Sequence, residues 1–194
     1  MNLNLSNSGG SGNYIRFSPQ ANAWTNQDGE FTFEKSVFDH ENLQTGWMLI
    51  ATGIFEFNPD PSLGQKGAQP SAEHKRGFRA TFYNKTMGVA EFSANGAGAN
   101  MGLEALWKQV QAQASANAGK LPVVEFKGSR PEKVGKGTTR VPLFEVVGWV
   151  ARPAALTASG ESEVEAIPFR EKPAPSKPEP SKPTPTMTDD EMFS

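Results

Sequence analysis

The stretch 74–83 alternates between apolar and polar residues, a pattern typical of a β-strand with one buried face. Period-two spacing places Lys75, Arg79 and Tyr83 together on the polar face. Lysine can neutralise a phosphate as a point charge, and arginine can also stack or form bidentate hydrogen bonds. A base can stack on tyrosine. These residue types indicate a surface along which a nucleic-acid backbone could run. The alternative is an ordinary solvated face.

A second group of cations lies in the segment 127–140, which contains one acid, Glu132. Its members are Lys127, Arg130, Lys133, Lys136 and Arg140. A Gly-rich arm with this charge can close over an extended polyanion, although lysines on a hairpin also keep it soluble. Phe126, next to the arm, is a candidate for base stacking or for the core.

Catalytic and metal-binding patterns are missing from the sequence. It contains no cysteine, which excludes disulfides, zinc–thiolate sites and cysteine nucleophiles, and its two histidines are far apart. Residues 96–102 match neither glycine fingerprint for phosphates. The acid pairs Asp28/Glu30 and Asp39/Glu41 border strand–turn junctions, where acids usually serve as solvated turn residues. We therefore predict a protein that is not an enzyme and has no metal or cofactor. An unrecognised carboxylate site at these four acids is an alternative.

The elements that must position these side chains follow from hydrophobic periodicity. We expect strands over residues 14–17, 30–38, 46–57, 74–83, 86–94, 121–127 and 138–150. The stretch 46–57 is apolar on both faces and predicts a central strand, and residues 58–72 predict a loop. Between the fifth and sixth strands we predict a helix that Asn100 caps and Gly119 ends. Its apolar positions recur at helical spacing: Leu103, Leu106, Trp107 and Val110.

This order predicts a mainly β fold. A five-stranded barrel of the OB-fold type, with one helix before the last two strands, has this layout if the early short strand is an extra. An SH3-like barrel or a small α+β sandwich also fits. We divide the chain into a flexible N-terminus (1–13), the barrel domain (14–152), a disordered linker (153–186) and an acidic tip (187–194).

Charge and proline content support this division. Residues 1–152 hold 15 Lys and Arg against 13 Asp and Glu, whereas residues 153–194 hold 4 against 8. Seven prolines in residues 168–185 favour extended conformations over helix or sheet. The sequence begins with neither a basic leader nor an apolar run, and no stretch approaches the roughly 20 apolar residues of a membrane span. We therefore expect a cytoplasmic protein without membrane contact.

The last residues combine three acids with two apolar side chains: Asp189, Asp190, Glu191, Met192 and Phe193. An exposed phenylalanine on a tether adds nothing to solubility, yet it can anchor in a pocket ringed by basic residues. The tip is similar to the acidic C-terminal peptide of bacterial and phage single-stranded-DNA-binding proteins, and the order of barrel, linker and tip is similar too. The sequence departs from that pattern by ending in Ser194. No stretch of the barrel aligns with the bacterial housekeeping proteins, so a divergent phage or mobile-element relative is expected.

The resemblance implies sequence-tolerant binding of single-stranded DNA and recruitment of replication, recombination or repair proteins through the tip. Such a protein acts in the cytoplasm of a bacterium or of a phage-infected host. The alternative from another class is a phage-type assembly protein that does not bind DNA and docks its tail on a partner. The sequence leaves homo-oligomerisation and the choice between DNA and RNA open.

Overall fold

The computed structural model describes residues 13–158. The predicted acidic tip, most of the predicted linker and all but Asn13 of the predicted N-terminal segment lie outside these residues. The strands are β1 (Asn13–Ser18), β2 (Ala23–Asn26), β3 (Gly29–Phe31), β4 (Ser36–Ala51), β5 (Ile54–Pro59), β6 (Lys75–Asn84), β7 (Gly88–Ala94), β8 (Lys120–Val134) and β9 (Gly137–Ala151). The helices are α1 (Ala97–Ala114), a 3₁₀ turn (Ser115–Asn117) and α2 (Ala154–Ala158).

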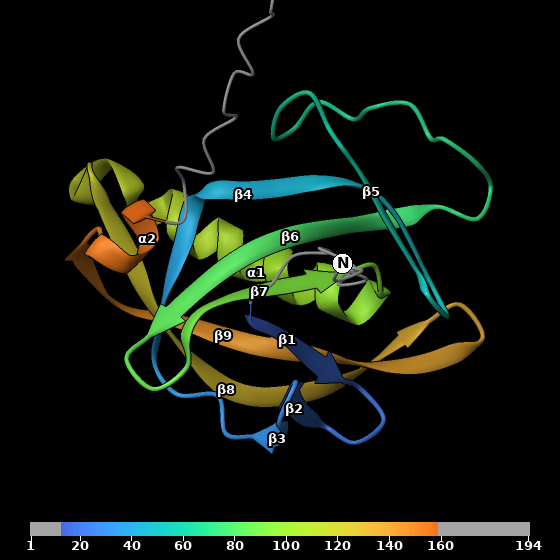
Figure 1. Ribbon diagram of the computed structural model, residues 1–194, viewed down its shortest axis with the longest axis horizontal. Coiled ribbons are helices and arrows are strands. Elements are labelled where there is room, and N and C mark those ends of the chain that lie inside the picture. The colour runs from blue at the N-terminus through green and yellow to red at the C-terminus, as the bar shows by residue number, and fades with distance from the viewer. Residues whose placement is uncertain (1–12, 159–194) are drawn as a thin grey trace, which may run out of the picture. The chain divides into compact units, whose positions relative to one another are not determined.

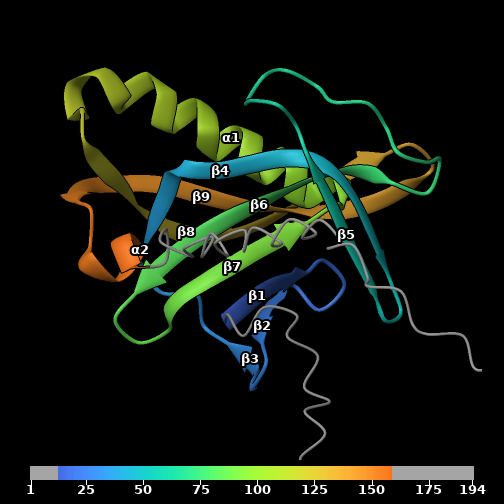
Figure 2. The same ribbon diagram turned by 45° about the horizontal axis from the view of Figure 1, so that its top comes forward.

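The described strands form one curled sheet, open rather than closed, in the order β3-β2-β1-β7-β6-β4-β8-β9, with β5 paired to β4 (Figures 1 and 2). Strands β1 and β7 run parallel, and the other pairs are antiparallel. The prediction of a mainly β fold with a helix before the last two strands is confirmed. The sheet has nine strands in the part of the chain described here, more than the five predicted.

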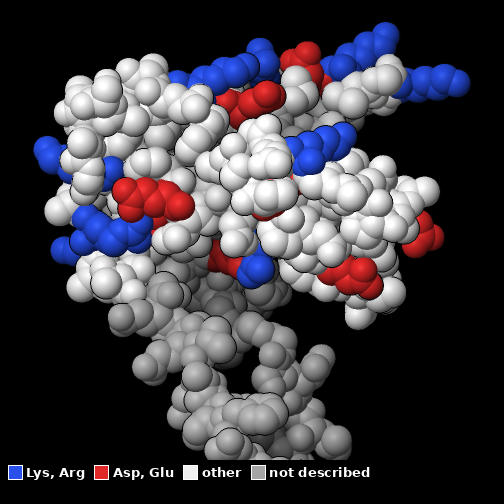
Figure 3. All heavy atoms as spheres, turned by 90° about the horizontal axis from the view of Figure 1, so that it is seen from above, with Lys and Arg blue, Asp and Glu red and all other residues white. Residues whose placement is uncertain are grey.

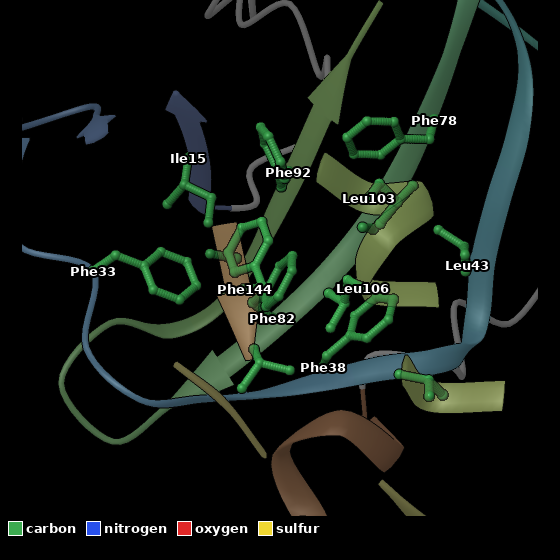
Figure 4. Packing of buried hydrophobic residues seen from close by; sticks show 14 of the residues in the cluster. Ile15, Phe33, Phe38, Leu43, Phe78, Phe82, Phe92, Leu103, Leu106 and Phe144 are labelled. Atoms are coloured by element: carbon green, nitrogen blue, oxygen red, sulfur yellow. The ribbon is translucent and has the colours of Figure 1, made fainter. Parts of the chain in front are cut away.

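The inside of the curl is filled by aromatic and aliphatic side chains that point toward one another (Figure 4). Phe38, Phe82 and Phe92 are at most 1% exposed. Trp24 of β2 lies 5.5 Å from Phe126 of β8 between ring centroids, so the two ends of the sheet meet through ring contacts. Edge-to-face contacts of this kind add to the stability that buried area provides.

Helix α1 lies along the free edge of β9. A side chain at Gly98 would meet the Arg140 carbonyl, and a Cβ at Gly102 would come within 2.6 Å of the Pro142 oxygen. The two glycines therefore let the helix approach the strand backbone closely. Further along the helix, Gln109 donates to the Phe144 carbonyl (2.8 Å) and accepts from the Val146 amide (3.1 Å). One helix face thus satisfies backbone groups that an edge strand otherwise leaves unpaired.

Replacing Gln109 with Ala should lower the free energy of unfolding by about 1–2 kcal/mol, because two hydrogen bonds to the β9 backbone are lost. Urea unfolding followed by circular dichroism measures this. Gln111→Ala is the matched control, since Gln111 is an exposed residue of the same helix. An equal effect of both substitutions would contradict the role of Gln109 at the strand edge.

The expected single strand over 46–57 is wrong, because the chain reverses within it. Strand β4 ends at Ala51, Gly53 adopts φ 74°, and β5 returns along β4 with Ala51 opposite Ile54. A glycine at positive φ is what a tight hairpin turn requires. The apolar run is therefore a hairpin, and its turn lies at Thr52–Gly53.

Three other boundaries differ from expectation. The expected strand over 30–38 is split between β3 and β4. Helix α1 begins after Gly96, and Asn100, the predicted cap, instead donates its side-chain amide to the Arg76 carbonyl (3.0 Å). The segment between the last two strands is not a loop, because β8 and β9 stay paired as far as Val134 and Gly137.

Candidate nucleic-acid interface

Strand β6 presents two distinct faces, as its alternating sequence predicts. Phe78, Ala80 and Phe82 are buried in the core, so Lys75, Arg79 and Tyr83 lie on the opposite side. We call that side of strands β4–β7 the outer face. Lys75 is exposed and forms no ion pair with any residue in the range 13–158.

The β4–β5 hairpin adds aromatic rings to the outer face, which sequence reasoning missed. Met48 of β4 lies directly opposite both Phe57 of β5 and Lys75 of β6, so the three form one row across the sheet. In the next row Ile50 faces Phe55, and these side chains are 43% and 51% exposed. Phe55 is the most exposed of the large apolar side chains in the described range. The sequence signal was Gly53, which marks the turn that carries these residues out of the core.

Arg79 reaches across the outer face to the same hairpin. Its guanidinium carbon lies 5.6 Å from the centre of the Phe57 ring. Its Nε donates to Glu91 of β7 at 3.0 Å, and its Nη2 donates to the same oxygen. The side chain remains 40% exposed. Arg79 therefore contacts both an aromatic ring and a carboxylate, whereas Lys75 has no ion-pair partner within residues 13–158.

A cleft of about 450 Å³ opens beside Arg79 on the outer face. Its walls are the β4 segment 41–45, the segment 59–63 after β5, and three strand residues, Arg79, Thr81 and Glu91. The register of β4 against β6 shifts between Asp39 and Gln44, and this irregularity shapes one wall. The cleft is thus lined mainly by polar side chains at the base of the β4–β5 hairpin.

Asp60 fixes the segment that follows β5. Its carboxylate, 3% exposed, accepts from the Arg76 guanidinium (2.8 and 2.5 Å), from the Thr45 hydroxyl (2.6 Å) and from the Gly67 amide (2.8 Å). The Arg76 guanidinium, before the other donors, holds the pKa of Asp60 well below its usual range. Trp47 donates to the Gly67 carbonyl at 2.9 Å. These hydrogen bonds hold the segment after β5 in a defined conformation despite its glycines and prolines.

The predicted cationic arm is the β8–β9 hairpin, and its charges do not share one surface. Lys127 is clamped between Glu125 (2.9 Å) and Glu145 (3.2 Å), which raises its pKa. Arg140 donates to Ser129 (3.3 Å), and strand alternation places it on the side opposite to Arg130. Lys133 and Lys136 near the turn are exposed and form no ion pair within residues 13–158.

Phe126 belongs to the core side of β8. It contacts Phe17, Trp24, Phe33 and Phe144 with ring-centroid distances between 5.5 and 6.3 Å. It is therefore not part of the outer face with Lys75, and we leave it out of the candidate interface. Position beside a cationic arm did not distinguish a stacking residue from a core residue.

The four acids of the alternative enzyme hypothesis do not come together. Arg152 donates to Asp39 through both terminal guanidinium nitrogens, Nη1 and Nη2 (2.9 and 2.8 Å), and also donates to Glu41 (2.7 Å). Asp28 and Glu30, in contrast, are exposed near the β2–β3 turn. No group of three or more His, Asp or Glu side chains that could hold a metal forms in the described part of the chain. The ion pair between Arg152 and Asp39 joins the residue that follows β9 to strand β4.

Charges of both signs are mixed on the surface that Figure 3 shows, with blue side chains along its upper margin and on its left side. In Figures 1 and 2 the β4–β5 hairpin, the β5–β6 connection and the tip of the β8–β9 hairpin lie at the same end of the domain. The predicted tip residues 189–193 lie outside the described range. Within residues 13–158, the candidate interface therefore consists of the outer face and the β8–β9 hairpin.

Comparisons of this chain with protein-family models, with curated proteins and with solved structures found no match. Among residues 13–158, no helix combines the length and the apolar character needed to cross a membrane.

Proposed function

We propose that strands β4, β6, β7, β8 and β9 form an OB-fold core. Their order in the sheet is β7-β6-β4-β8-β9, and α1 lies between the third and fourth of them along the chain. The long first strand, β4, pairs with both β6 and β8 and has an irregular register, which supports this reading. Strands β1–β3 and β5 would then be additions to that core.

The function that the geometry supports best is binding of single-stranded DNA with little sequence preference. The observation that carries this proposal is the outer face, where exposed Phe55 and half-buried Phe57 lie near Lys75 and Arg79. Aromatic rings beside cations form a stacking platform that tolerates any base. In OB-folds, oligonucleotides bind across the second and third strands and the loops that flank them. Here those strands are β6 and β7, flanked by the β4–β5 hairpin and the β8–β9 hairpin.

Four cations are the best candidates for phosphate contacts, and two of them, Arg130 and Lys133, lie on opposite sides of the β8–β9 hairpin by strand alternation. A DNA strand that contacts both must pass around the tip of the hairpin. Lys75, Lys133 and Lys136 are exposed and have no ion pair within residues 13–158, and Arg130 has a long contact of 3.6 Å with Glu132. Tyr83, further along β6, offers a second stacking surface on the outer face. Lys127 and Arg140 already have partners, so they contribute less than the sequence predicts.

The acidic tip adds a second activity to this proposal. Residues 189–193 would recruit a replication or recombination protein, because three acids and a phenylalanine suit a basic pocket with an apolar floor. The acids do not suit a polyanion. Binding of DNA by the domain and binding of a partner by the tip are therefore separable.

Anisotropy titration of labelled oligonucleotides at several salt concentrations tests the proposal. About four phosphate contacts predict a slope of log affinity against log salt near −3 for single strands. Single-stranded DNA should bind more tightly than duplex, and removing residues 187–194 should leave or improve this affinity. A flat salt response, or lost DNA binding in the shortened chain, would contradict the proposal.

One observation favours the rival function of an assembly protein. Ile54 is 46% exposed on the face of the hairpin opposite Phe55, so the hairpin is apolar on both sides near its turn. An apolar projection of this kind can also dock on another protein. The assembly hypothesis predicts no affinity for oligonucleotides and a stable high-order assembly, which sedimentation analysis detects.

A further inference from the structure

One of the two hydrogen-bonding edges of the Arg79 guanidinium, formed by Nε and Nη2, is already occupied. Its Nε and Nη2 both donate to one oxygen of Glu91, and the other oxygen of Glu91 accepts from the Ser93 hydroxyl. A phosphate could bind this edge only by displacing a carboxylate that has its own second partner. Nη1 and the second hydrogen of Nη2 have no partner among residues 13–158, but the carboxylate of Glu91 offsets the charge of the guanidinium and so weakens its attraction for a phosphate.

The guanidinium of Arg79 also lies near the aromatic ring of Phe57. Between the row of Arg79 and the row of Phe57, the sheet carries Gly46 on β4 and Gly77 on β6. A Cβ at Gly46 would meet the Asn58 carbonyl oxygen at 2.3 Å, so the backbone of the neighbouring strand approaches closely at this row. The guanidinium carbon of Arg79 lies 5.6 Å from the centre of the Phe57 ring. A Cβ at Gly77 would meet the Ala94 carbonyl oxygen at 2.5 Å, which shows how tightly the sheet coils here.

The remaining surface of Arg79 lines the cleft. Gln44 and Thr81, from the strands beside it, also line this cleft and can donate and accept hydrogen bonds. The carboxylates of Glu41, Asp60 and Glu91 line it as well. Each of these carboxylates is paired with an arginine, and Arg79, the one cation in the lining of the cleft, is paired with Glu91. An anion entering the cleft would therefore meet no cation that lacks a carboxylate partner, whereas a neutral base would meet the guanidinium and polar side chains.

We propose that Arg79 stacks a nucleobase in this cleft and does not bind a phosphate. The base lies on the guanidinium, whose other side rests on Phe57, and Glu91 keeps the guanidinium plane in place. Bases of single-stranded nucleic acids stack on arginine planes as they do on aromatic rings. This inference rests on the proposed function and specifies a one-nucleotide subsite within it.

The test is the salt dependence of oligonucleotide affinity for two substitutions that separate charge from shape. Arg79→Lys keeps the charge but removes the planar guanidinium, so affinity should fall about 5- to 150-fold at every salt concentration with an unchanged slope. Lys75→Gln is the control for a phosphate ligand, and it should reduce the magnitude of the slope by about 0.7. Retention of wild-type affinity by Arg79→Lys would overturn the inference.

Glu91→Gln provides a second, independent test. If Glu91 withholds Arg79 from phosphate, this substitution raises affinity and steepens the slope by about 0.7; that result would overturn the inference. Under our proposal the salt dependence of the affinity stays the same and the affinity falls, because the Arg79 guanidinium loses the carboxylate that holds it in place. Circular dichroism of each variant checks folding. Absence of oligonucleotide binding by the wild-type protein would refute the proposed function itself, whereas either overturning result in a protein that binds DNA would refute only the role of Arg79.

Discussion

Replacing Asp60 with Ala should lower the free energy of unfolding by about 2–4 kcal/mol, because it breaks a partly buried ion pair and removes the acceptor of two further hydrogen bonds. The Asp60 carboxylate is 3% exposed and is the common acceptor for Arg76, Thr45 and Gly67. Without it the half-buried guanidinium of Arg76 loses its counter-charge, and the Thr45 hydroxyl and the Gly67 amide lose their acceptor. Urea unfolding of the two proteins, compared at pH 7, measures the difference.

Asp28→Ala is the matched control for this prediction. Asp28 is an exposed acid near the β2–β3 turn, and its removal should change the unfolding free energy by no more than about 0.5 kcal/mol. If Asp60→Ala were as mild as Asp28→Ala, Asp60 would not be the residue that ties the segment after β5 to the sheet.

The ion pair between Asp60 and Arg76 makes the free energy of unfolding depend on pH in a defined direction. Because the pKa of Asp60 is lower in the folded protein than its ordinary value of 3.8, the folded state binds its proton less readily than the unfolded state. The contribution of Asp60 to stability is therefore complete above about pH 5 and is lost as the pH falls below 4 toward the folded pKa. The difference in unfolding free energy between wild type and Asp60→Ala should narrow over that range. A difference that stays constant down to pH 2 would contradict this assignment.

Phe55→Ala should weaken binding of single-stranded DNA by about 1–3 kcal/mol, roughly 5- to 150-fold, if one base stacks on this ring. The side chain is 51% exposed, so its removal should change the unfolding free energy little. Anisotropy titration and urea unfolding of the same variant separate the two effects. A loss of affinity without a loss of stability is the result expected of a binding residue.

Ile54→Ala is the control within the same hairpin. Ile54 is 46% exposed but lies on the opposite face from Phe55, so its removal should leave DNA affinity unchanged. Equal losses from both substitutions would mean that the hairpin acts as a whole and that Phe55 is not a specific stacking surface. Loss of a high-order assembly in Ile54→Ala would favour the rival function.

Local pattern predicted those parts of the fold that depend on one element alone. The alternation over residues 74–83 predicted β6 and its two faces, and the helical spacing of Leu103, Leu106 and Val110 predicted α1. The hairpin of β4 and β5 was missed because a run that is apolar on both faces also fits a central strand. An exposed apolar hairpin and a buried strand share this composition, and Gly53 was the one residue that separated them.

The candidate site was predictable to the same extent. Lys75, Arg79 and Tyr83 follow from period-two spacing, and they do lie on one face of β6. The partnership of Arg79 with Glu91 and Phe57 depends on how β6 sits against β7 and β5, which no single segment encodes. Phe126 was ambiguous for the same reason, since its ring partners come from four other segments of the chain.

The position of α1 has a consequence for the behaviour of the protein at high concentration. An uncovered strand edge is a template on which another chain can add a strand, and repeated addition leads to fibrils. Along β9 the carbonyl of Phe144 and the amide of Val146 are already bonded to Gln109, and two glycines bring the helix backbone against the strand. Copies of this chain crowded side by side therefore cannot extend one another's sheets through this stretch of β9.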